Sequence, residues 1–354
     1  MKASALDLAG RVLVAGFDGR EAPASVLADL AGERLAGVIL FRRNVGSPEE
    51  VMRLNASLIE ACPEASPPLI GVDQEGGRVA RLGPPVVKLP PMRRLGEHDD
   101  LALTARAGRV LGAQLAALGF SMDFAPVLDV DTNPENPVIG DRAFSGDPEA
   151  VARHALAFSD GLLGAGVASC GKHFPGHGDT DLDSHLALPR LAHERARLDA
   201  VELVPFRAAR GRIPAIMTAH VVFEALDPGV PATLSPIALR ALLRDELGYD
   251  GVIISDDLEM RAVYDHFGVA ETAVRAVEAG CDLLLVCSKL DELEVAREAL
   301  AARAEADPAF AARLEDAAER GLALRRRFRP RVDAAAFEAT LAEAEALTDM
   351  LARL

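Results

Sequence analysis

A stretch of sixteen residues, from Cys170 to His185, concentrates side chains that can do chemistry. It reads CGKHFPGHGDTDLDSH and holds three histidines, three aspartates, three glycines and one lysine. Such a segment packs poorly, because glycine loses much backbone freedom on folding and buried polar groups need partners. We therefore interpret it as a loop that holds a small polar ligand, rather than as a solvated surface loop.

The end of this stretch, Asp183-Ser184-His185, offers an acid and base unit. A carboxylate two residues from an imidazole can bind one ring nitrogen and so set the tautomer of the other. The histidine can then donate a proton and later recover it. A D-x-H triplet alone is a weak signal, and its weight here comes from the surrounding loop.

Asp256 is the second candidate for chemistry. It follows the apolar run Gly251 to Ser255, which predicts a buried strand that holds the carboxylate rigidly at its tip. A carboxylate in that place can attack an electrophilic carbon or stabilise a cation. We expect Asp257 to point elsewhere, because neighbours on an extended segment face opposite ways.

Zinc binding is the rival interpretation of the same loop. His173, His177, Asp179 and His185 could supply ligands, but they match neither H-E-x-x-H nor another zinc pattern with a clear third ligand. The chain also lacks the GxSxG elbow of a serine hydrolase and the GxxxxGK[ST] phosphate loop. We expect no metal and no other cofactor.

Short apolar runs alternate with amphipathic segments of helical length along the chain. Several runs are apolar almost throughout, as expected for a parallel sheet covered on both faces. Eight strands are predicted, at Val12–Ala15, Gly37–Phe41, Leu69–Asp73, Ser121–Val127, Val167–His173, Ala215–His220, Gly251–Asp256 and Asp282–Cys287.

The segments between these strands carry helix signals. Ser47-Pro48 with Glu50 reads as an N-cap with a capping box, and Asp147-Pro148, Ser235-Pro236 and Asp307-Pro308 repeat the cap-plus-proline pattern. Glycines just before the strands, such as Gly119 and Gly166, are typical of helix C-caps.

Eight strands alternating with helices favour an α/β fold, a single (β/α)8 TIM-type barrel, over a doubly wound open sheet. No GxGxxG follows the first strand, which argues against a dinucleotide-binding open sheet. We expect one catalytic domain over residues 1–354, with the barrel at about 10–300 and C-terminal helices at about 307–354 on its outside.

Charged and polar residues fall where the predicted strands end, which is where barrel enzymes place their chemistry. A separate salt bridge for each of these residues explains the pattern less well than their convergence on one shared polar site. The residues concerned are Asp73, Arg81, Asp141-Arg142, Lys172-His173, His220 and Asp256-Asp257.

The overall composition narrows the partners. The net charge of −16 argues against nucleic acid and anionic membrane surfaces. The four cysteines lack CxxC spacing, which favours free thiols in a reducing compartment, and the first residues form neither a secretory signal nor a membrane span. We expect a cytoplasmic protein, and a monomer.

Four motifs together resemble family 3 glycoside hydrolases, specifically the bacterial β-N-acetylhexosaminidases of peptidoglycan recycling. They are KHFPGHGDTDLDSH (172–185), GVDQEGGRVARL (71–82), GDRAF (140–144) and ISDDLEM (254–260), in the family's order. The resemblance covers about residues 10–300.

The resemblance implies a role for each matching residue. Asp256 would be the nucleophile, His185 the general acid/base and Asp183 its dyad partner. Asp73, Arg81, Arg142, Lys172 and His173 would bind sugar hydroxyls. The substrate would be a small N-acetylglucosaminide or muropeptide. The absence of tryptophan and the presence of only two tyrosines mean that binding must depend on hydrogen bonds rather than ring stacking.

Other functions stay open on the sequence alone. A neutral histidine repels phosphate less than a carboxylate does, so phosphorolysis on the same scaffold is an alternative to hydrolysis. Catalysis assisted by the 2-acetamido group of the substrate is a third route. A non-catalytic sugar-binding barrel would need the nucleophile or the acid to be missing, and both are present.

Overall fold

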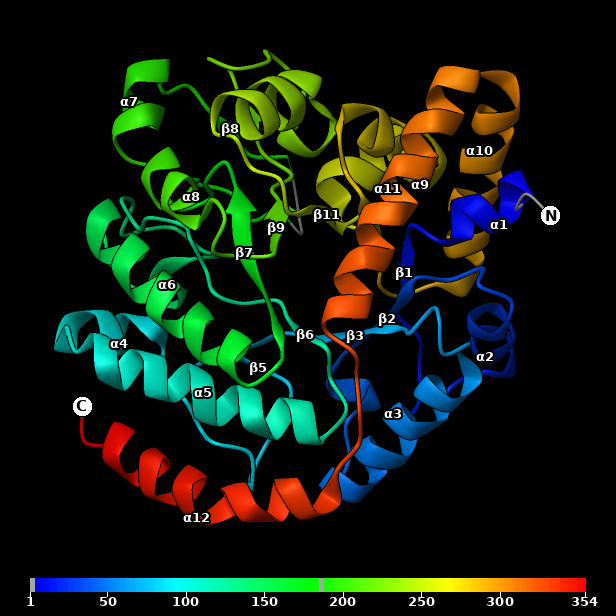
Figure 1. Cartoon of the computed structure of the whole chain (residues 1–354). Helices are drawn as coiled ribbons and strands as arrows, with labels where there is room; N and C mark the ends of the chain where they lie inside the picture. Colours follow the sequence, from blue (N-terminus) through cyan, green and yellow to red (C-terminus); the bar gives the residue numbers. More distant parts are fainter. Residues whose placement is uncertain (1–3, 185–187) are drawn as a thin grey trace.

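A closed barrel of eight parallel strands forms the centre of the molecule (Figure 1). The structure is a computed structural model that describes residues 4–184 and 188–354. The strand order around the barrel is β1-β2-β3-β6-β7-β9-β11-β12 and back to β1. This order confirms the (β/α)8 prediction and excludes the open sheet.

All eight predicted strands are present, most of them shorter than predicted. They are β1 (Leu13–Ala15), β2 (Gly37–Leu40), β3 (Leu69–Val72), β6 (Met122–Asp123), β7 (Ala168–Phe174), β9 (Ala215–Thr218), β11 (Val252–Asp257) and β12 (Leu283–Val286). The fourth strand, β6, shrinks most, because Pro126 has no N–H with which to continue a ladder. A single bridge between Val127 and Lys172 resumes the pairing beyond it.

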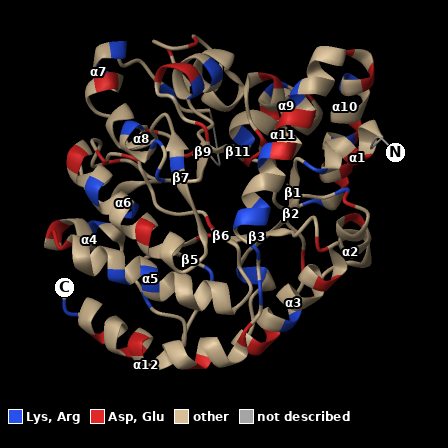
Figure 2. Cartoon of the chain, in the orientation of Figure 1, with Lys and Arg blue, Asp and Glu red and all other residues tan. Residues whose placement is uncertain are grey.

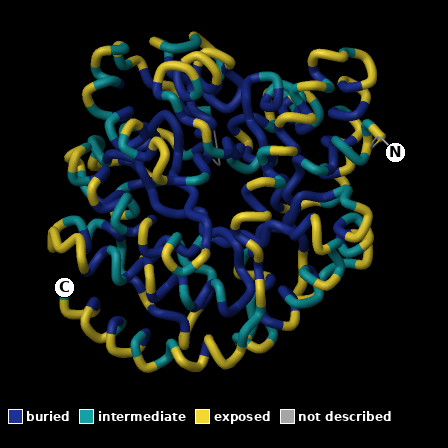
Figure 3. The backbone as a smooth tube through the Cα atoms, viewed as in Figure 1, coloured by how far each residue is buried: buried dark blue, intermediate teal, exposed yellow. Residues whose placement is uncertain are grey.

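The strands are apolar on both faces because both faces are covered. One cluster of side chains, including Val14, Ile39, Met217 and Leu285, fills the barrel interior. A larger cluster joins the outward faces of the strands to the helices around them. Figure 3 shows the buried centre and the exposed outer turns of the helices.

Helices begin at the four cap-plus-proline signals of the sequence. Ser47 forms a capping box with Glu50, Asp147 and Asp307 cap their helices, and Ser235 Oγ accepts from the N–H of Ala238. The barrel helices are α2 (Ala24–Ala31), α3 (Pro48–Ala61), α4 (Met92–His98), α5 (Leu101–Ala117), α6 (Pro148–Gly164), α7 (Arg195–Ala200), α8 (Leu203–Ala209), η4 (Ile237–Glu246), α9 (Arg261–Ala279) and α10 (Leu290–Ala306).

Glycine makes the turn from helix into strand at the expected places. Gly119 and Gly166 have φ values of 92° and 87°, which side chains other than glycine rarely adopt. Two further helices, α11 (Pro308–Arg327) and α12 (Ala334–Leu351), pack on the outside as predicted, and α12 lies along α5 (Figure 1). Glu343 of α12 pairs there with Arg106 and Arg109.

Several small elements were not predicted. They are the helix α1 (Ala5–Gly10), the hairpin β4 (Gln74–Gly76) with β5 (Val79–Ala80), the pair β8 (Arg190–Leu191) and β10 (Val222–Phe223), and the short helical turns η1 (Arg42–Asn44), η2 (Gly140–Arg142) and η3 (Ala232–Leu234). Elements of two to six residues are too short to produce a hydrophobic period.

Acidic and basic residues are interspersed along the outer helices (Figure 2). Within the described ranges, no helix combines the length and the apolar character that crossing a membrane would require.

Candidate active site

A cavity of about 250 Å³ opens at the carboxyl ends of the strands. Ligand pockets commonly measure about 300–1,000 Å³, so this one suits a ligand as small as one sugar ring. Six of the eight predicted site residues line it: Asp73, Arg81, Arg142, Lys172, His173 and Asp256. Of the residues expected to converge from the strand ends, all but Asp141 and His220 line this cavity.

A larger hollow of about 480 Å³ lies at the amino ends of β9 and β11. Two of its arginines are partly exposed and paired with surface acids, Arg212 with Asp160 and Arg320 with Asp316. Barrel enzymes carry their chemistry at the opposite face, so we assign the site to the smaller cavity.

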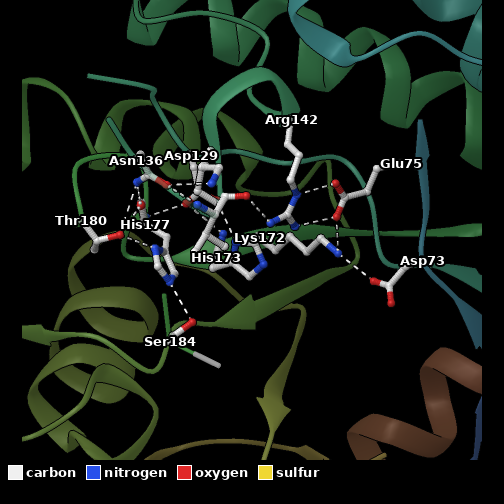
Figure 4. A network of polar contacts seen from close by, with 12 residues as sticks. Asp73, Glu75, Asp129, Asn136, Arg142, Lys172, His173, His177, Thr180 and Ser184 are labelled. Atoms are coloured by element: carbon white, nitrogen blue, oxygen red, sulfur yellow. Dashed lines mark hydrogen bonds and ion pairs between the residues drawn. The ribbon is translucent and has the colours of Figure 1, made fainter. Parts of the chain in front are cut away.

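Lys172, on β7, is the centre of a buried ion-pair network on one wall of the cavity (Figure 4). Its Nζ lies 2.8 Å from Asp73 Oδ1 and 2.6 Å from Glu75 Oε1. Arg142 makes a two-pronged contact with the same Glu75, at 2.9 and 2.8 Å. Arg81 completes the network by donating to Asp73 Oδ2 at 3.1 Å.

Glu75 was not predicted as a site residue, although the sequence shows it two positions after Asp73. Asp73, just before β4, and Glu75, within it, both line the cavity, as do Val79 of β5 and Arg81 just after it. Glu75 is almost fully buried and neutralises both Arg142 and Lys172, so it sets the position of two predicted sugar-binding residues. The period-two alternation of the hairpin is the signal that could have identified it.

The network keeps its members charged. Burial alone would raise the pKa of Asp73 and Glu75, but the adjacent Lys172, Arg81 and Arg142 outweigh burial and hold both carboxyl pKa values below their usual range. Burial likewise opposes the charge of Lys172, and the two carboxylates nevertheless raise its pKa. The wall therefore presents fixed charges and donors to a ligand.

His173 follows Lys172 and is fixed by a second buried carboxylate. Its Nδ1 lies 2.7 Å from Asp129 Oδ2, and the other oxygen of Asp129 accepts the backbone N–H of both His173 and His177. Burial would raise the pKa of Asp129, but these histidines outweigh it and lower that pKa. Asp129, which sequence reasoning missed, thus orients the imidazole at the cavity.

Both ring nitrogens of His177 are engaged in hydrogen bonds within its own loop, which indicates a structural role for this residue. Its Nδ1 contacts Thr180 Oγ1 at 2.7 Å, and its Nε2 contacts Ser184 Oγ at 2.9 Å. Asn136 ties the same turn to the loop after β6 by donating to the carbonyl of His177. Burial, with the nearby His173, lowers the pKa of His177 to about 4, so the ring is neutral at pH 7.

Asp179, another candidate zinc ligand, has other partners. Its two carboxylate oxygens contact Thr132 and His193. Across residues 4–184 and 188–354, no three His, Cys, Asp or Glu side chains are grouped as a metal ion would require.

Asp183 lies within the described residues and is half-buried, but it is not among the residues that line the cavity. Its predicted partner His185 belongs to 185–187, outside the described residues. The acid/base dyad therefore stays a prediction.

Asp256 lies near the tip of β11, as predicted, and its Oδ1 accepts the N–H of Asp257 at 2.8 Å. The expectation that Asp257 points elsewhere is only partly correct. Asp257 also lines the cavity, while its Oδ1 accepts the N–H groups of Cys287 and Glu259. Burial, together with the charges of Glu259 and Asp256, raises the pKa of Asp257 to about 7.

His220, two residues after the end of β9, is not among the residues that line the cavity. Its ring nitrogens contact Thr233 Oγ1 and the carbonyl of Asp257, which places the imidazole behind β11.

Comparison with known proteins agrees with this geometry. The model of the glycosyl hydrolase family 3 N-terminal domain matches residues 11–324. A beta-hexosaminidase of Neisseria meningitidis serogroup C is 43% identical over 295 residues, covering 77% of this chain and 80% of the relative. One from Pseudomonas aeruginosa is 41% identical over 267 residues, covering 75% and 79%.

Solved structures give the same result. A family 3 beta-N-acetylglucosaminidase from Paenibacillus sp. superposes with a TM-score of 0.89 at 41% identity, covering 98% of this chain and 69% of the other. NagZ from Neisseria gonorrhoeae superposes with a TM-score of 0.81 at 34% identity, covering 97% of each chain. The chain belongs to glycosyl hydrolase family 3.

Proposed function

We propose that this glycoside hydrolase is an exo-acting β-N-acetylglucosaminidase that removes a terminal, non-reducing N-acetylglucosamine with retention of configuration. The observation that carries the proposal is one small cavity that joins Asp256 at a strand tip to the charged wall around Lys172. The family membership, and relatives that are named beta-hexosaminidases, support the activity.

The wall around Lys172 suits the hydroxyl groups of a sugar. Lys172 and Arg81 present donors, and Asp73 presents carboxylate oxygens, each already fixed by its neighbours. The Nε of Arg81 is buried and finds no acceptor within the described residues, so a ligand oxygen would satisfy it. A solved structure of NagZ from Neisseria gonorrhoeae in complex with N-trifluoroacetyl-D-glucosamine supports an N-acylated glucosamine as the ligand class.

In the proposed mechanism, Asp256 attacks the anomeric carbon and forms a covalent glycosyl-enzyme, which water then hydrolyses. A histidine, His185 with Asp183 as partner, protonates the leaving oxygen in the first step and activates water in the second. These steps need imidazolium first and neutral imidazole next, so a pKa near neutrality serves both.

The proposed substrates are muropeptides that carry N-acetylglucosamine on 1,6-anhydro-N-acetylmuramic acid, in cell-wall recycling in the cytoplasm. The four cysteines, all free thiols, are consistent with a reducing compartment. The proposal includes a monomer with no cofactor. Cell fractionation tests the location, and light scattering tests the oligomeric state.

Replacing the proposed nucleophile tests the proposal most directly. Asp256→Ala should lower kcat/KM for an aryl N-acetylglucosaminide by roughly 10³-fold or more, because it removes the carboxylate on which the proposed covalent intermediate forms. Asp160→Ala, which alters an exposed pair with Arg212, is the matched control and should turn over normally.

Near-normal turnover by folded Asp256→Ala protein would overturn the assignment. Mass spectrometry after reaction with a slow fluorinated glycosyl substrate should find the sugar on Asp256. Absence of an adduct, with retained stereochemistry, would instead favour assistance by the 2-acetamido group. Product analysis with and without phosphate separates hydrolysis from phosphorolysis.

A further inference from the structure

The backbone ladder between β11 and β12 is interrupted beside the cavity. Ile254 pairs with Leu283, and the next pair is Asp257 with Leu285. Between these two pairs, β11 advances by three residues and β12 by only two. Ser255 and Asp256 occupy this bulge. A bulge bends its strand and changes the direction of a side chain, and here that side chain is Asp256, which lines the cavity.

Three side chains of β11 and its following turn replace the missing ladder bonds. Ser255 Oγ accepts the N–H of Leu285 at 3.0 Å, and Asp257 Oδ1 accepts that of Cys287 at 3.2 Å. The carboxylate of Glu259 accepts the next two, from Ser288 at 2.5 Å and from Lys289 at 3.1 Å. Positions 255, 257 and 259 thus form a side-chain ladder along β12 and its exit.

The side-chain ladder also fixes Asp256. The N–H of Asp257 donates to Asp256 Oδ1 at 2.8 Å, so the orientation of that carboxylate depends on where the backbone of Asp257 is held. The bond from Asp257 to Cys287 holds it on one side, and the N–H of Glu259, which donates to Asp257 Oδ1 at 3.0 Å, holds it on the other. Glu259 itself is not among the residues that line the cavity.

We propose that Ser255, Asp257 and Glu259 are positioning residues that hold the β11 bulge and thereby aim Asp256 at the anomeric carbon. This inference rests on the proposed role of Asp256. Glu259 is the most informative member, because it acts from outside the cavity through the N–H groups of Ser288 and Lys289. Its carboxylate also lies at the N-terminus of α10, where a negative charge is favourable.

The electrostatics of the bulge give a second readout. Burial raises the pKa of Asp257 to about 7, and the charges of Glu259 and Asp256 add to this, while the N–H groups of Glu259 and Cys287 oppose it. Three other groups lie near Asp257. The thiol of Cys287 lies across the strand, Arg43 donates to the carbonyl of Cys287, and the ring of His220 contacts the carbonyl of Asp257. Removing the charge of Glu259 should therefore lower the pKa of Asp257.

Two variants of Glu259 separate positioning from folding. Glu259→Ala removes both acceptors and should lower kcat/KM by about 10- to 100-fold, the range expected when a reacting group is slightly misplaced. The loss should be equal for an activated aryl glycoside and for an alkyl glycoside with a poor leaving group, because the nucleophile serves both. KM should change little, since the wall around Lys172 is untouched.

Glu259→Gln keeps an acceptor but no charge, so it should recover most of the kcat/KM lost in Glu259→Ala. An inflection of the pH profile that comes from Asp257, expected near pH 7, should move to lower pH in Glu259→Gln. Glu292→Ala, which removes a carboxylate bonded to Tyr264, is the matched control on the same face and should have normal kcat/KM.

Glu259→Ala within twofold of the natural enzyme, or a loss confined to the poor leaving group, would overturn the inference. If Glu259→Ala does not fold, Ser255→Ala and the pH profile of Glu259→Gln decide instead. An active Asp256→Ala enzyme would overturn the proposed function itself, whereas an inactive one beside normal Glu259 variants would overturn only the positioning role.

Discussion

The two walls of the cavity hold carboxylates in opposite ways. On the β3 and β7 side, Asp73 and Glu75 are paired with Lys172, Arg81 and Arg142. On the β11 and β12 side, Asp257 and Glu259 accept backbone N–H groups and have no Lys or Arg ion-pair partner among the described residues. The same residue type is therefore held by charge on one wall and by the backbone on the other.

This difference appears in the protonation of the two walls. The cations hold the pKa of Asp73 and Glu75 down despite burial, whereas burial raises the pKa of Asp257 to about 7. A wall of fixed charges suits sugar hydroxyls, which need strong donors and acceptors.

Among the substitutions that test the difference between the two walls, Lys172→Met should cause the largest loss of stability. It leaves Asp73 and Glu75 buried without their shared cation, which typically costs about 3–5 kcal/mol of unfolding free energy. Denaturant titration measures this loss, and activity should disappear with it. Lys88→Met, at an exposed position, should stay within about 0.5 kcal/mol of the natural chain. A small loss of unfolding free energy in Lys172→Met would mean that the ion pairs of the network do not depend on Lys172.

A matched pair of amide substitutions should sharpen the contrast. Glu75→Gln removes the negative charge that pairs with Arg142 and Lys172, and it should cost about 1.5–3 kcal/mol of unfolding free energy at both pH 5.5 and pH 8.5. The pKa of Glu75 lies below its ordinary value of 4.5, since the two cations outweigh burial. Its stabilisation is therefore fully present above pH 4.5 and is lost only as the pH falls through the depressed value.

Asp257→Asn should behave differently, because the pKa of Asp257 is raised from 3.8 to about 7, mainly by burial. Asp257 therefore weakens the fold increasingly as the pH rises from 3.8 to 7. Asparagine keeps the Oδ1 acceptor, so this variant should match the natural chain near pH 4 and exceed its melting temperature at pH 8.5. Parallel melting curves of both variants decide, and equal pH dependence would remove the contrast between the walls.

Much of the barrel could be predicted because its signals are local. Apolar runs, N-caps such as Ser47 and turn glycines such as Gly119 act within a few residues of each other. The convergence of Asp73, Lys172 and Asp256 followed from one rule of parallel barrels, that strand ends meet at one face.

The parts that sequence reasoning missed depend on partners far apart in the chain. Glu75 matters through Arg142, 67 residues away, and Asp129 through His173, 44 residues away. The bulge in β11 exists only relative to β12, so no pattern within residues 251–257 could reveal it. Pairing across elements, not residue type, decided these roles.

One carboxyl on the charged wall provides the smallest and most selective test. Asp123, at the end of β6, is fully buried beside the network, and its Oδ1 accepts the N–H of Gln74 at 2.9 Å. Its Oδ2 is buried and has no partner within the described residues. Burial raises its pKa to about 8, and the charges of Asp73 and Glu75 add to the effect.

Asp123 therefore costs stability progressively as the pH rises from 3.8 to 8, where the unfolded chain releases a proton that the folded chain retains. Asp123→Asn keeps the acceptor for Gln74 and removes that cost, while its amide still needs partners of its own. It should raise the unfolding free energy by about 1 kcal/mol at pH 8 and hardly at all at pH 4. Urea titrations at the two pH values measure the difference. An equal gain at both pH values would contradict the prediction, because it would mean that the gain does not come from the raised pKa of Asp123.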